Sequence, residues 1–243
     1  MNILNKYKQS HQTKQMSVSL EGYEYLAGDD DKKEEAIRND VHSLFVKDAE
    51  EDGVVFKHYR LFLGPVFSNN NSLDSILNKL LDVNKNDRLE IRIASPGGLL
   101  SEGFTIINLI KNNFMGRVDT IIDTFAASMA SGIFIEGTRR MIYNTSDIMF
   151  HDFSSGFFGK SSEINTAVKH ANEHAGVLLF KTLTDNGYLT QEEFVRLKDG
   201  LDFYFGSYEM FKRGIATHLI HQNEFIPRGF VLENPEKYGL IVT

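Results

Sequence analysis

Cysteine is absent from this chain of 243 residues, and so is any long apolar run. Without cysteine, neither a disulfide nor a thiolate-bound metal can hold the fold together, which fits a reducing compartment. The first twenty residues contain basic and polar groups but lack the apolar core of a signal peptide. No stretch reaches the roughly 18 consecutive apolar residues of a membrane helix. We therefore expect a soluble protein of the cytoplasm with no membrane partner.

An excess of basic residues is also missing. The chain has 26 Lys and Arg against 33 Asp and Glu, a net charge of −7. Between Glu21 and Gly53 there are twelve acidic and four basic residues, a net charge of −8, so the remainder is close to neutral. No basic face is expected to attract a phosphate backbone, which excludes nucleic acid as an expected partner.

The uneven charge also indicates how the chain is organised. A hydrophobic content of 42% suits a folded protein, and the length suits one α/β core with appendages. We predict an acidic N-terminal appendage over 1–53, a core domain over 54–221 and a C-terminal tail over 222–243. Within 33–47, the spacing of Ile37, Val41 and Leu44 fits a docked helix, and a solvated arm fits the same residues.

Strand-like and helix-like stretches alternate through the core. Residues Arg88 to Ile93 alternate polar and apolar side chains, which is the period of a strand, whereas Leu73, Ile76 and Leu80 share one helix face. Thr190 and Glu193 form a capping box, which opens a helix. The order predicts an α/β layered core. The expected strands are 58–63, 88–93, 118–124, 141–143 and 148–151, and the expected helices are 72–81, 100–112, 126–137, 161–185 and one that begins near 190.

Candidate chemistry lies where strands pass into helices. Ser128 follows the strand that ends at Thr124, among alanines that allow close backbone packing. A serine at such a junction lies near free N–H groups and the positive end of a helix, as in a nucleophile elbow, although the G-x-S-x-G pattern is absent. Ordinary packing of small residues in a helix would explain the same stretch.

Two further junctions have similar alternatives. Gly97 and Gly98 leave their amide groups unobstructed, which suits either half of an oxyanion hole or a plain turn. His151 ends a short apolar strand, where an imidazole could serve a serine as general base or have a structural role.

Taken together, these motifs resemble the Clp protease proteolytic-subunit family. The resemblance runs from about Tyr59 to Ile220. It rests on the order and spacing of five separate motifs: Ser95-Pro96-Gly97-Gly98 with Gly103; Ala126-Ala127-Ser128-Met129; Ile148-Met149-Phe150-His151; Gly156-x-x-Gly159 before a long helix; and Asp202 with Ser207, Glu209 and Gly214.

The resemblance implies a serine endopeptidase. The catalytic triad of the family falls on Ser128, His151 and Asp202, and its oxyanion hole falls on the amide groups of Gly98 and Met129. Such an enzyme needs no metal and no cofactor, and its substrate is a peptide or an unfolded protein.

The resemblance also implies an architecture. The fold would be the Clp/crotonase type, made of repeated β-β-α units with a long protruding handle helix over 161–185. The handle would pack two rings face to face, so the expected assembly is a homo-oligomer of heptameric rings, or a tetradecamer of two such rings. The loop from Phe153 to Lys160 would line the substrate groove.

Some features depart from the family. Gly200 and Leu201 precede Asp202 where many members have an Arg-Asp pair that links the rings. The long acidic arm replaces short axial loops, which argues against docking to the AAA+ unfoldase that would otherwise be the expected partner. Phage-encoded relatives process capsid or scaffold proteins without an ATPase, in the host cytoplasm, so a cellular and a phage setting both stay open.

Rival residues and rival functions stay open as well. Ser131 lies one turn beyond Ser128, and Asp152 follows His151 directly, where the family commonly has glutamine. Asp147 and Asp199 are other candidate acids, and His170 and His174 flank Glu173 without a third zinc ligand. The alternative functions are a catalytically silent ring or scaffold subunit and a crotonase-like enzyme of acyl thioesters, which a large distance between Ser128 and His151 would favour.

Overall fold

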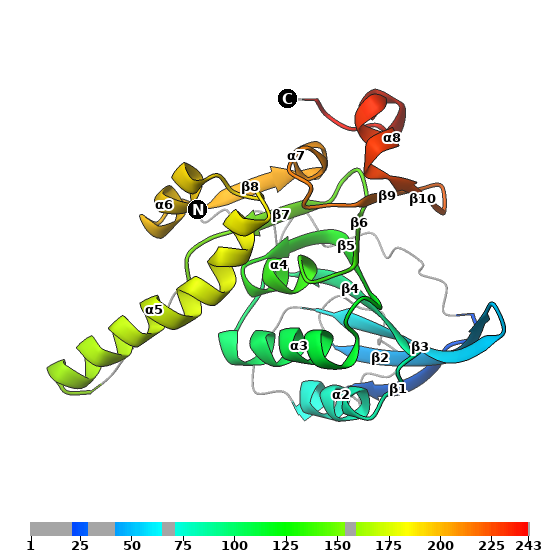
Figure 1. The fold of residues 1–243 in the computed structure, drawn as a ribbon, viewed down its shortest axis with the longest axis horizontal. Coiled ribbons are helices and arrows are strands. Elements are labelled where there is room, and N and C mark those ends of the chain that lie inside the picture. Colours follow the sequence, from blue (N-terminus) through cyan, green and yellow to red (C-terminus); the bar gives the residue numbers. More distant parts are fainter. Residues whose placement is uncertain (1–20, 29–41, 65–70, 154–158, 243) are drawn as a thin grey trace.

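The computed structural model describes residues 21–28, 42–64, 71–153 and 159–242 (Figure 1). Its strands and helices alternate along most of the chain. The strands are β1 (Glu24–Gly28), β2 (Ser43–Glu51), β3 (Val54–Leu63), β4 (Arg88–Ser95), β5 (Val118–Ala127), β6 (Arg139–Ile142), β7 (Asp147–Phe150), β8 (Phe203–Gly206), β9 (His218–His221) and β10 (Glu224–Pro227). The helices are α2 (Asn71–Leu81), α3 (Leu100–Asn113), α4 (Met129–Phe134), α5 (Ser161–Asp185), α6 (Gln191–Lys198), α7 (Ser207–Lys212), α8 (Arg228–Glu233) and the 3₁₀ helix η2 (Pro235–Tyr238).

These strands form one mixed sheet in the order β1-β2-β3-β4-β5-β6-β9-β10. The central strands β3, β4, β5 and β6 are parallel. Beyond Ile122, β5 leaves β6 and pairs with β7 instead, and β7 pairs antiparallel with β8. The sheet therefore branches at the carboxyl end of β5, and this end is where Ser128 follows.

The hydrophobic core lies between the sheet and helices α2, α3 and α4. Ile91 and Ile93 of β4 are fully buried, and they share one cluster with Leu80 of α2 and Ile106 of α3. Burying a side chain of this size contributes about 1.5–3 kcal/mol, so the apolar faces read from the sequence drive the helices onto the sheet. The predicted α/β alternation is confirmed in this region, with helix and strand ends within a few residues of those expected.

Two local predictions are wrong. Residues 43–47 belong to β2 rather than to a helix, and 33–41 lie outside the described residues. Strand β2 pairs with β3 along its whole length, from Ser43 opposite Phe62 to Glu51 opposite Val54, so hydrogen bonds to a distant segment override the local spacing. The small-residue helix α4 begins at Met129, not at 126, because Ala126 and Ala127 still pair with β7.

Residues on both sides of the predicted core domain extend its sheet and its hydrophobic core. The division of the chain at 53 and 221 stays a prediction. Leu44 of β2 is fully buried in the main cluster, and β1 extends the sheet beyond β2. Near the other end, α8 and η2 follow β10, and Val231 and Tyr238 are buried in the same cluster.

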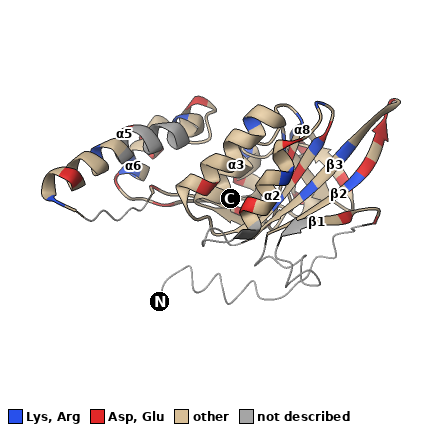
Figure 2. Cartoon of the chain, turned by 90° about the horizontal axis from the view of Figure 1, so that it is seen from below, with Lys and Arg blue, Asp and Glu red and all other residues tan. Residues whose placement is uncertain are grey.

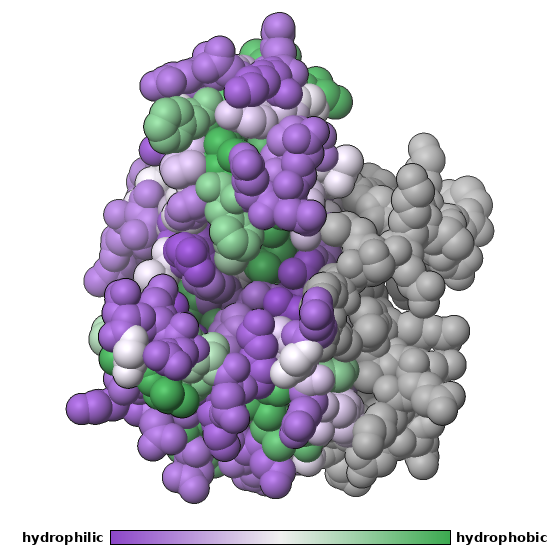
Figure 3. Space-filling view, turned by 90° about the vertical axis from the view of Figure 1, so that its right-hand side faces the viewer, coloured by the Kyte–Doolittle hydropathy of each residue, from purple (hydrophilic) through white to green (hydrophobic). Residues whose placement is uncertain are grey.

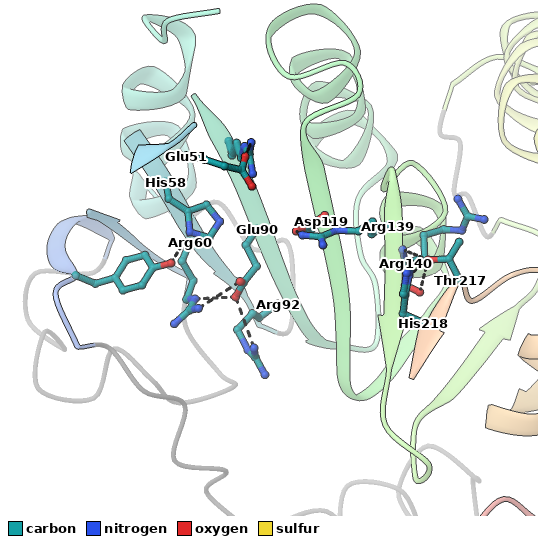
Figure 4. A network of polar contacts seen from close by, with 12 residues as sticks. Glu51, His58, Arg60, Glu90, Arg92, Asp119, Arg139, Arg140, Thr217 and His218 are labelled. Carbon is teal, nitrogen blue, oxygen red and sulfur yellow. Dashed lines mark hydrogen bonds and ion pairs between the residues drawn. The ribbon is translucent and has the colours of Figure 1, made fainter. Parts of the chain in front are cut away.

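The opposite face of the central strands carries a row of ion pairs (Figure 4). Arg60 of β3 donates to Glu90 of β4 at 2.7 and 3.2 Å, and Glu90 also pairs with Arg92 at 3.5 Å. Arg92 then donates to both carboxylate oxygens of Asp123 on β5. Glu90, Arg92 and Asp123 are each buried, and a buried charge is tolerated only when it is paired and hydrogen-bonded, as these are.

The surface of the described residues is mixed in character. Basic and acidic residues are interspersed along the strands and helices in the view of Figure 2. Figure 3 shows mostly hydrophilic residues on a second side, with hydrophobic ones in small groups. None of the helices in the described ranges is long and apolar enough to cross a membrane.

Candidate active site

Ser128 lies in a sharp turn between β5 and α4. Its backbone has φ 57° and ψ −127°, a region that non-glycine residues avoid because the Cβ atom crowds the backbone. The Ser128 N–H donates to the Met149 carbonyl of β7 at 3.1 Å, and the Ser128 carbonyl accepts from the N–H groups of Ser131 and Gly132. These bonds hold the strained residue, which is the geometry by which a strand-to-helix turn presents a nucleophile.

A glycine turn packs directly against this serine. Gly97 has φ +94°, and a Cβ atom at this position would lie 2.5 Å from the Ala127 carbonyl oxygen and 2.5 Å from Ser128 Cβ. The Ser95 hydroxyl accepts the Gly97 N–H at 3.2 Å, which fixes the turn from inside the core. The glycine at 97 therefore lets two strand-to-helix turns approach each other more closely than any side chain would permit.

The two predicted oxyanion donors come from these two turns. Gly98 follows Gly97, and Met129 is the first residue of α4, where helix N–H groups have no partner inside the helix. Within the described residues, neither the Gly98 N–H nor the Met129 N–H donates a hydrogen bond. Both donors are available to a ligand at the turn.

Ser128 and His151 line the same pocket. His151 directly follows β7, and β7 lies beside the last residues of β5, so the end of each strand delivers one of the two side chains. Most of the wall is apolar. The other lining residues are Leu100, Met129, Ser131, Gly132, Ile135, Phe150, Phe153 and Leu183.

The imidazole of His151 has a buried nitrogen atom without a partner. Within the described residues, His151 Nε2 accepts and donates no hydrogen bond. Such an atom costs free energy unless a bound group or a side-chain movement satisfies it. No hydrogen bond joins Ser128 to His151, or His151 to Asp202, in the described part of the chain. In a site without substrate, catalytic hydrogen bonds are often long or unformed.

Asp202 directly precedes β8, the strand that pairs with β7, and it does not line the pocket that Ser128 and His151 share. The last pair of β7 and β8 is Phe150 with Phe203, and continuing this antiparallel register by one residue would place His151 opposite Asp202. Residues directly opposite each other have Cβ atoms about 4.5–5.5 Å apart. The side chain of Asp202 is exposed, and the pKa of Tyr204 is raised first by burial and then by the Asp202 charge.

The rival residues have other partners or positions. Ser131 is buried, and its hydroxyl donates to the Ser128 carbonyl at 2.5 Å. Asp152 accepts from Lys198 Nζ with both carboxylate oxygens at 2.9 Å, so its charge is already paired. Asp147 begins β7, four residues before His151, and Asp199 is an exposed residue after α6.

Sequence reasoning missed several residues of this region. Lys198 ends α6 and had no motif to mark it, because a basic residue in the last turn of a helix is common. Ile135 and Leu183 were visible only as apolar helix positions. Phe153 begins the loop that was expected to line a groove, and it does line the pocket, whereas 154–158 lie outside the described residues.

The described side chains include no group of three or more His, Cys, Asp or Glu residues that could hold a metal ion. His170 lies on α5 in an exposed position.

Comparison with known proteins adds two findings. The family model described as Clp protease matches residues 48–223. An ATP-dependent Clp protease proteolytic subunit from Ligilactobacillus salivarius (strain UCC118) is 35% identical over 108 residues, which cover 42% of this chain and 54% of that protein. The chain thus spans about half the length of this curated relative.

Proposed function

Because this chain belongs to the Clp protease family, we propose that it is a serine endopeptidase with Ser128, His151 and Asp202 as its catalytic triad. The mixed sheet with helices between its parallel strands is the Clp/crotonase-type α/β fold of that family. The observation that carries the proposal is the strained turn at Ser128, which opens into the same pocket as His151.

In the proposed mechanism, Ser128 Oγ attacks the carbonyl carbon of the scissile peptide bond. His151 takes the hydroxyl proton as the new C–O bond forms, and the Gly98 and Met129 N–H groups bind the oxygen that becomes negative. His151 then gives the proton to the leaving amine, the C–N bond breaks and an acyl-enzyme remains. A water molecule, deprotonated by His151, attacks the acyl group and regenerates the Ser128 hydroxyl. Asp202 orients the imidazole and stabilises its charged form.

The triad requires Asp202 to turn toward His151. Its position one residue before β8 supports this step, because continuing the register of β7 and β8 by one residue would place it opposite His151. We propose that bound substrate completes the arrangement. The apolar wall supports a preference for an apolar residue beside the scissile bond, since burying such a side chain is favourable there.

We further propose that the chain works as a homo-oligomer, in heptameric rings that enclose the active sites, with peptides or unfolded proteins as substrates. An AAA+ unfoldase is a candidate partner in a cellular setting, and a phage setting would need none. These proposals follow from the family and not from the geometry of one chain.

Reaction with a fluorophosphonate probe tests the proposed function. We expect an adduct on Ser128, identified by peptide mass mapping, which is lost in Ser128→Ala and reduced about 10³-fold or more in rate in His151→Ala. Ser101→Ala is the control because it removes an exposed serine hydroxyl on α3 that already has a partner and does not line the pocket. It should react within about threefold of the wild type.

The competing function is a catalytically silent ring or scaffold subunit. The missing hydrogen bonds of His151 and the exposure of Asp202 favour it specifically. A correctly assembled protein that gains no adduct and cleaves no peptide would support this second function. A large distance between Ser128 and His151 would have favoured the crotonase-like alternative, and their shared pocket counts against it.

A further inference from the structure

An ion pair links Asp152, the residue after His151, to Lys198, the last residue of the helix that precedes Asp202. Lys198 Nζ donates to Asp152 Oδ1 and Oδ2, each at 2.9 Å. Asp152 Oδ1 also accepts the Phe153 N–H at 2.9 Å, which holds the carboxylate against its own loop. Both side chains are only about a quarter exposed, at 29% for Lys198 and 25% for Asp152.

The same lysine contacts the wall of the pocket. Lys198 Nζ lies 5.3 Å from the centre of the Phe153 ring, within the range of a cation–π interaction. Phe153 lines the pocket together with Ser128 and His151. One ammonium group therefore contacts both the carboxylate of the residue after the candidate base and an aromatic ring that lines the pocket.

The chain leads from this ion pair directly to Asp202. Lys198 is the last residue of α6, and only 199–201 separate it from Asp202. Gly200 has φ +94°, so the linker turns sharply at a residue suited to that conformation. Fixing Lys198 to Asp152 thus fixes the start of the short loop that presents Asp202 to the end of β7.

The ion pair between Lys198 and Asp152 also distinguishes the two carboxylates that could serve His151. Asp152 follows His151 directly in the sequence, and Asp202 would lie opposite His151 if the register of β7 and β8 continued by one residue. Lys198 neutralises Asp152 with two hydrogen bonds and leaves Asp202 as the acid without a basic partner in the described residues.

We propose that Lys198 and Asp152 are positioning residues, which hold the Asp202 loop against β7 and keep Asp152 from competing for His151. This inference rests on the proposed function. It assigns no chemical step to either residue, because neither side chain is argued to touch the substrate. It goes beyond the triad by explaining how a carboxylate can directly follow the candidate base without replacing Asp202.

Replacing the lysine by an uncharged side chain of similar length tests the inference. In Lys198→Met we expect kcat for a short peptide to fall about tenfold with KM within about twofold, because the loop is misplaced while the pocket remains. The acid limb of the kcat/KM profile should move to higher pH by about half a unit, since an unpaired Asp152 stabilises the charged imidazole. Lys198→Arg should keep both properties near those of the wild type.

A second variant distinguishes the effect of losing the ion pair from the effect of an unpaired Asp152 charge, and a third variant serves as a control. Asp152→Asn removes the competing carboxylate as well as the ion pair and leaves the Lys198 ammonium unpaired. We therefore expect kcat to fall and the acid limb to move to lower pH, because a nearby positive charge disfavours the charged imidazole. Lys212→Met is the matched control: Lys212 pairs with Glu209 at 2.9 Å and lies 5.6 Å from the Tyr208 ring, but it does not line the pocket. The inference is overturned if Lys198→Met behaves like Lys212→Met, or if Lys198→Arg is as impaired as Lys198→Met.

A measurement without turnover keeps this test separate from the proposed function. The ring titration of His151, followed by NMR in the full-length chain and assigned with His151→Gln, should have a higher midpoint in Lys198→Met than in the wild type. A wild-type protein that is inert toward probe and peptide would sink the peptidase proposal alone. An unchanged midpoint would overturn the positioning role, whatever the activity.

Discussion

At the scale of single residues, the site depends on backbone conformations that only particular side chains allow. Ser128 occupies a strained conformation, and Gly97 packs against it at a distance that excludes a Cβ atom. Residues held in such conformations cost about 1–3 kcal/mol each and persist where the surroundings over-determine them. Here the surroundings are the bonds from β7 and α4 to the turn at Ser128.

Gly97→Ala is expected to disrupt the site. The new Cβ atom would meet the Ala127 carbonyl oxygen and Ser128 Cβ, each at 2.5 Å, so the turn at Ser128 must move. We expect the rate of probe labelling to fall about 10²-fold or more, with a loss of about 2–4 kcal/mol in the free energy of unfolding. Labelling kinetics and urea unfolding measure the two effects.

Gly116→Ala is the matched control for this change. Gly116 has φ +75° but no atom within 4 Å of an added Cβ, so it reports the conformational cost of alanine without the clash. It should lose about 1 kcal/mol and keep its labelling rate. Equal labelling in both variants would show that the close approach at Gly97 does not support the site.

At the scale of helices and strands, local patterns predict some elements well and others poorly. Strand β4 and helices α2, α3 and α5 follow directly from apolar periodicity, and both halves of the Thr190–Glu193 capping box are formed. Strand β2 could not be read this way, because its nine residues are specified by pairing with β3 rather than by their own spacing. The start of α4 was placed early for the same reason.

The residues of the candidate site likewise differ in whether the sequence alone could predict them. Ser128 and His151 could be located from motif order, and the structure brings them to one pocket. The contact of Lys198 with Asp152 joins residues 46 positions apart and has no signature in the sequence. The side-chain direction of Asp202 depends on a loop, and loop conformation follows from tertiary contacts that a single sequence does not show.

A further prediction concerns Glu193 in α6, the helix that precedes the loop with Asp202. Its carboxylate caps α6 by accepting the Thr190 N–H at 2.8 Å and receives two hydrogen bonds from Arg213 at 2.7 and 2.8 Å. The pKa of Glu193 is lowered, chiefly by the hydrogen bonds from Arg213, so the folded state favours its charged form. This contribution is present above the unfolded pKa of about 4.3 and is lost as the pH falls below it.

In Glu193→Gln we therefore expect a loss of about 1–2 kcal/mol in the free energy of unfolding at pH 7. The difference from the wild type should shrink as the pH falls from 5 toward 3. Glu163→Gln is the control, because Glu163 accepts the Lys160 N–H at the start of α5 without an arginine partner and is mostly exposed. A difference at Glu193 that does not depend on pH would contradict the assigned origin of the pKa shift.

At the scale of the whole molecule, α5 projects away from the body that the sheet and the other helices form (Figure 1). Its 25 residues span about 37 Å at 1.5 Å per residue. Its last turns are anchored, since Leu183 is buried in the core, whereas Val168 is 41% exposed toward the free end. The proposed ring assembly would place another subunit against this projecting part of α5.

Val168→Arg tests whether the proposed assembly uses this helix. Placing an unpaired charge in an interface costs several kcal/mol, so the variant should sediment as smaller species than the wild type at the same concentration. Val55→Arg is the matched control, because Val55 is 68% exposed near the start of β3, and the β2–β3 hairpin and α5 lie on opposite sides of the view in Figure 1. It should assemble like the wild type. Since Val168 does not line the pocket, Val168→Arg should still react with the fluorophosphonate probe wherever the single chain keeps its fold. If both variants sediment like the wild type, the ring contact lies on another surface, whereas assembly lost in both would show only that added charge disfavours association.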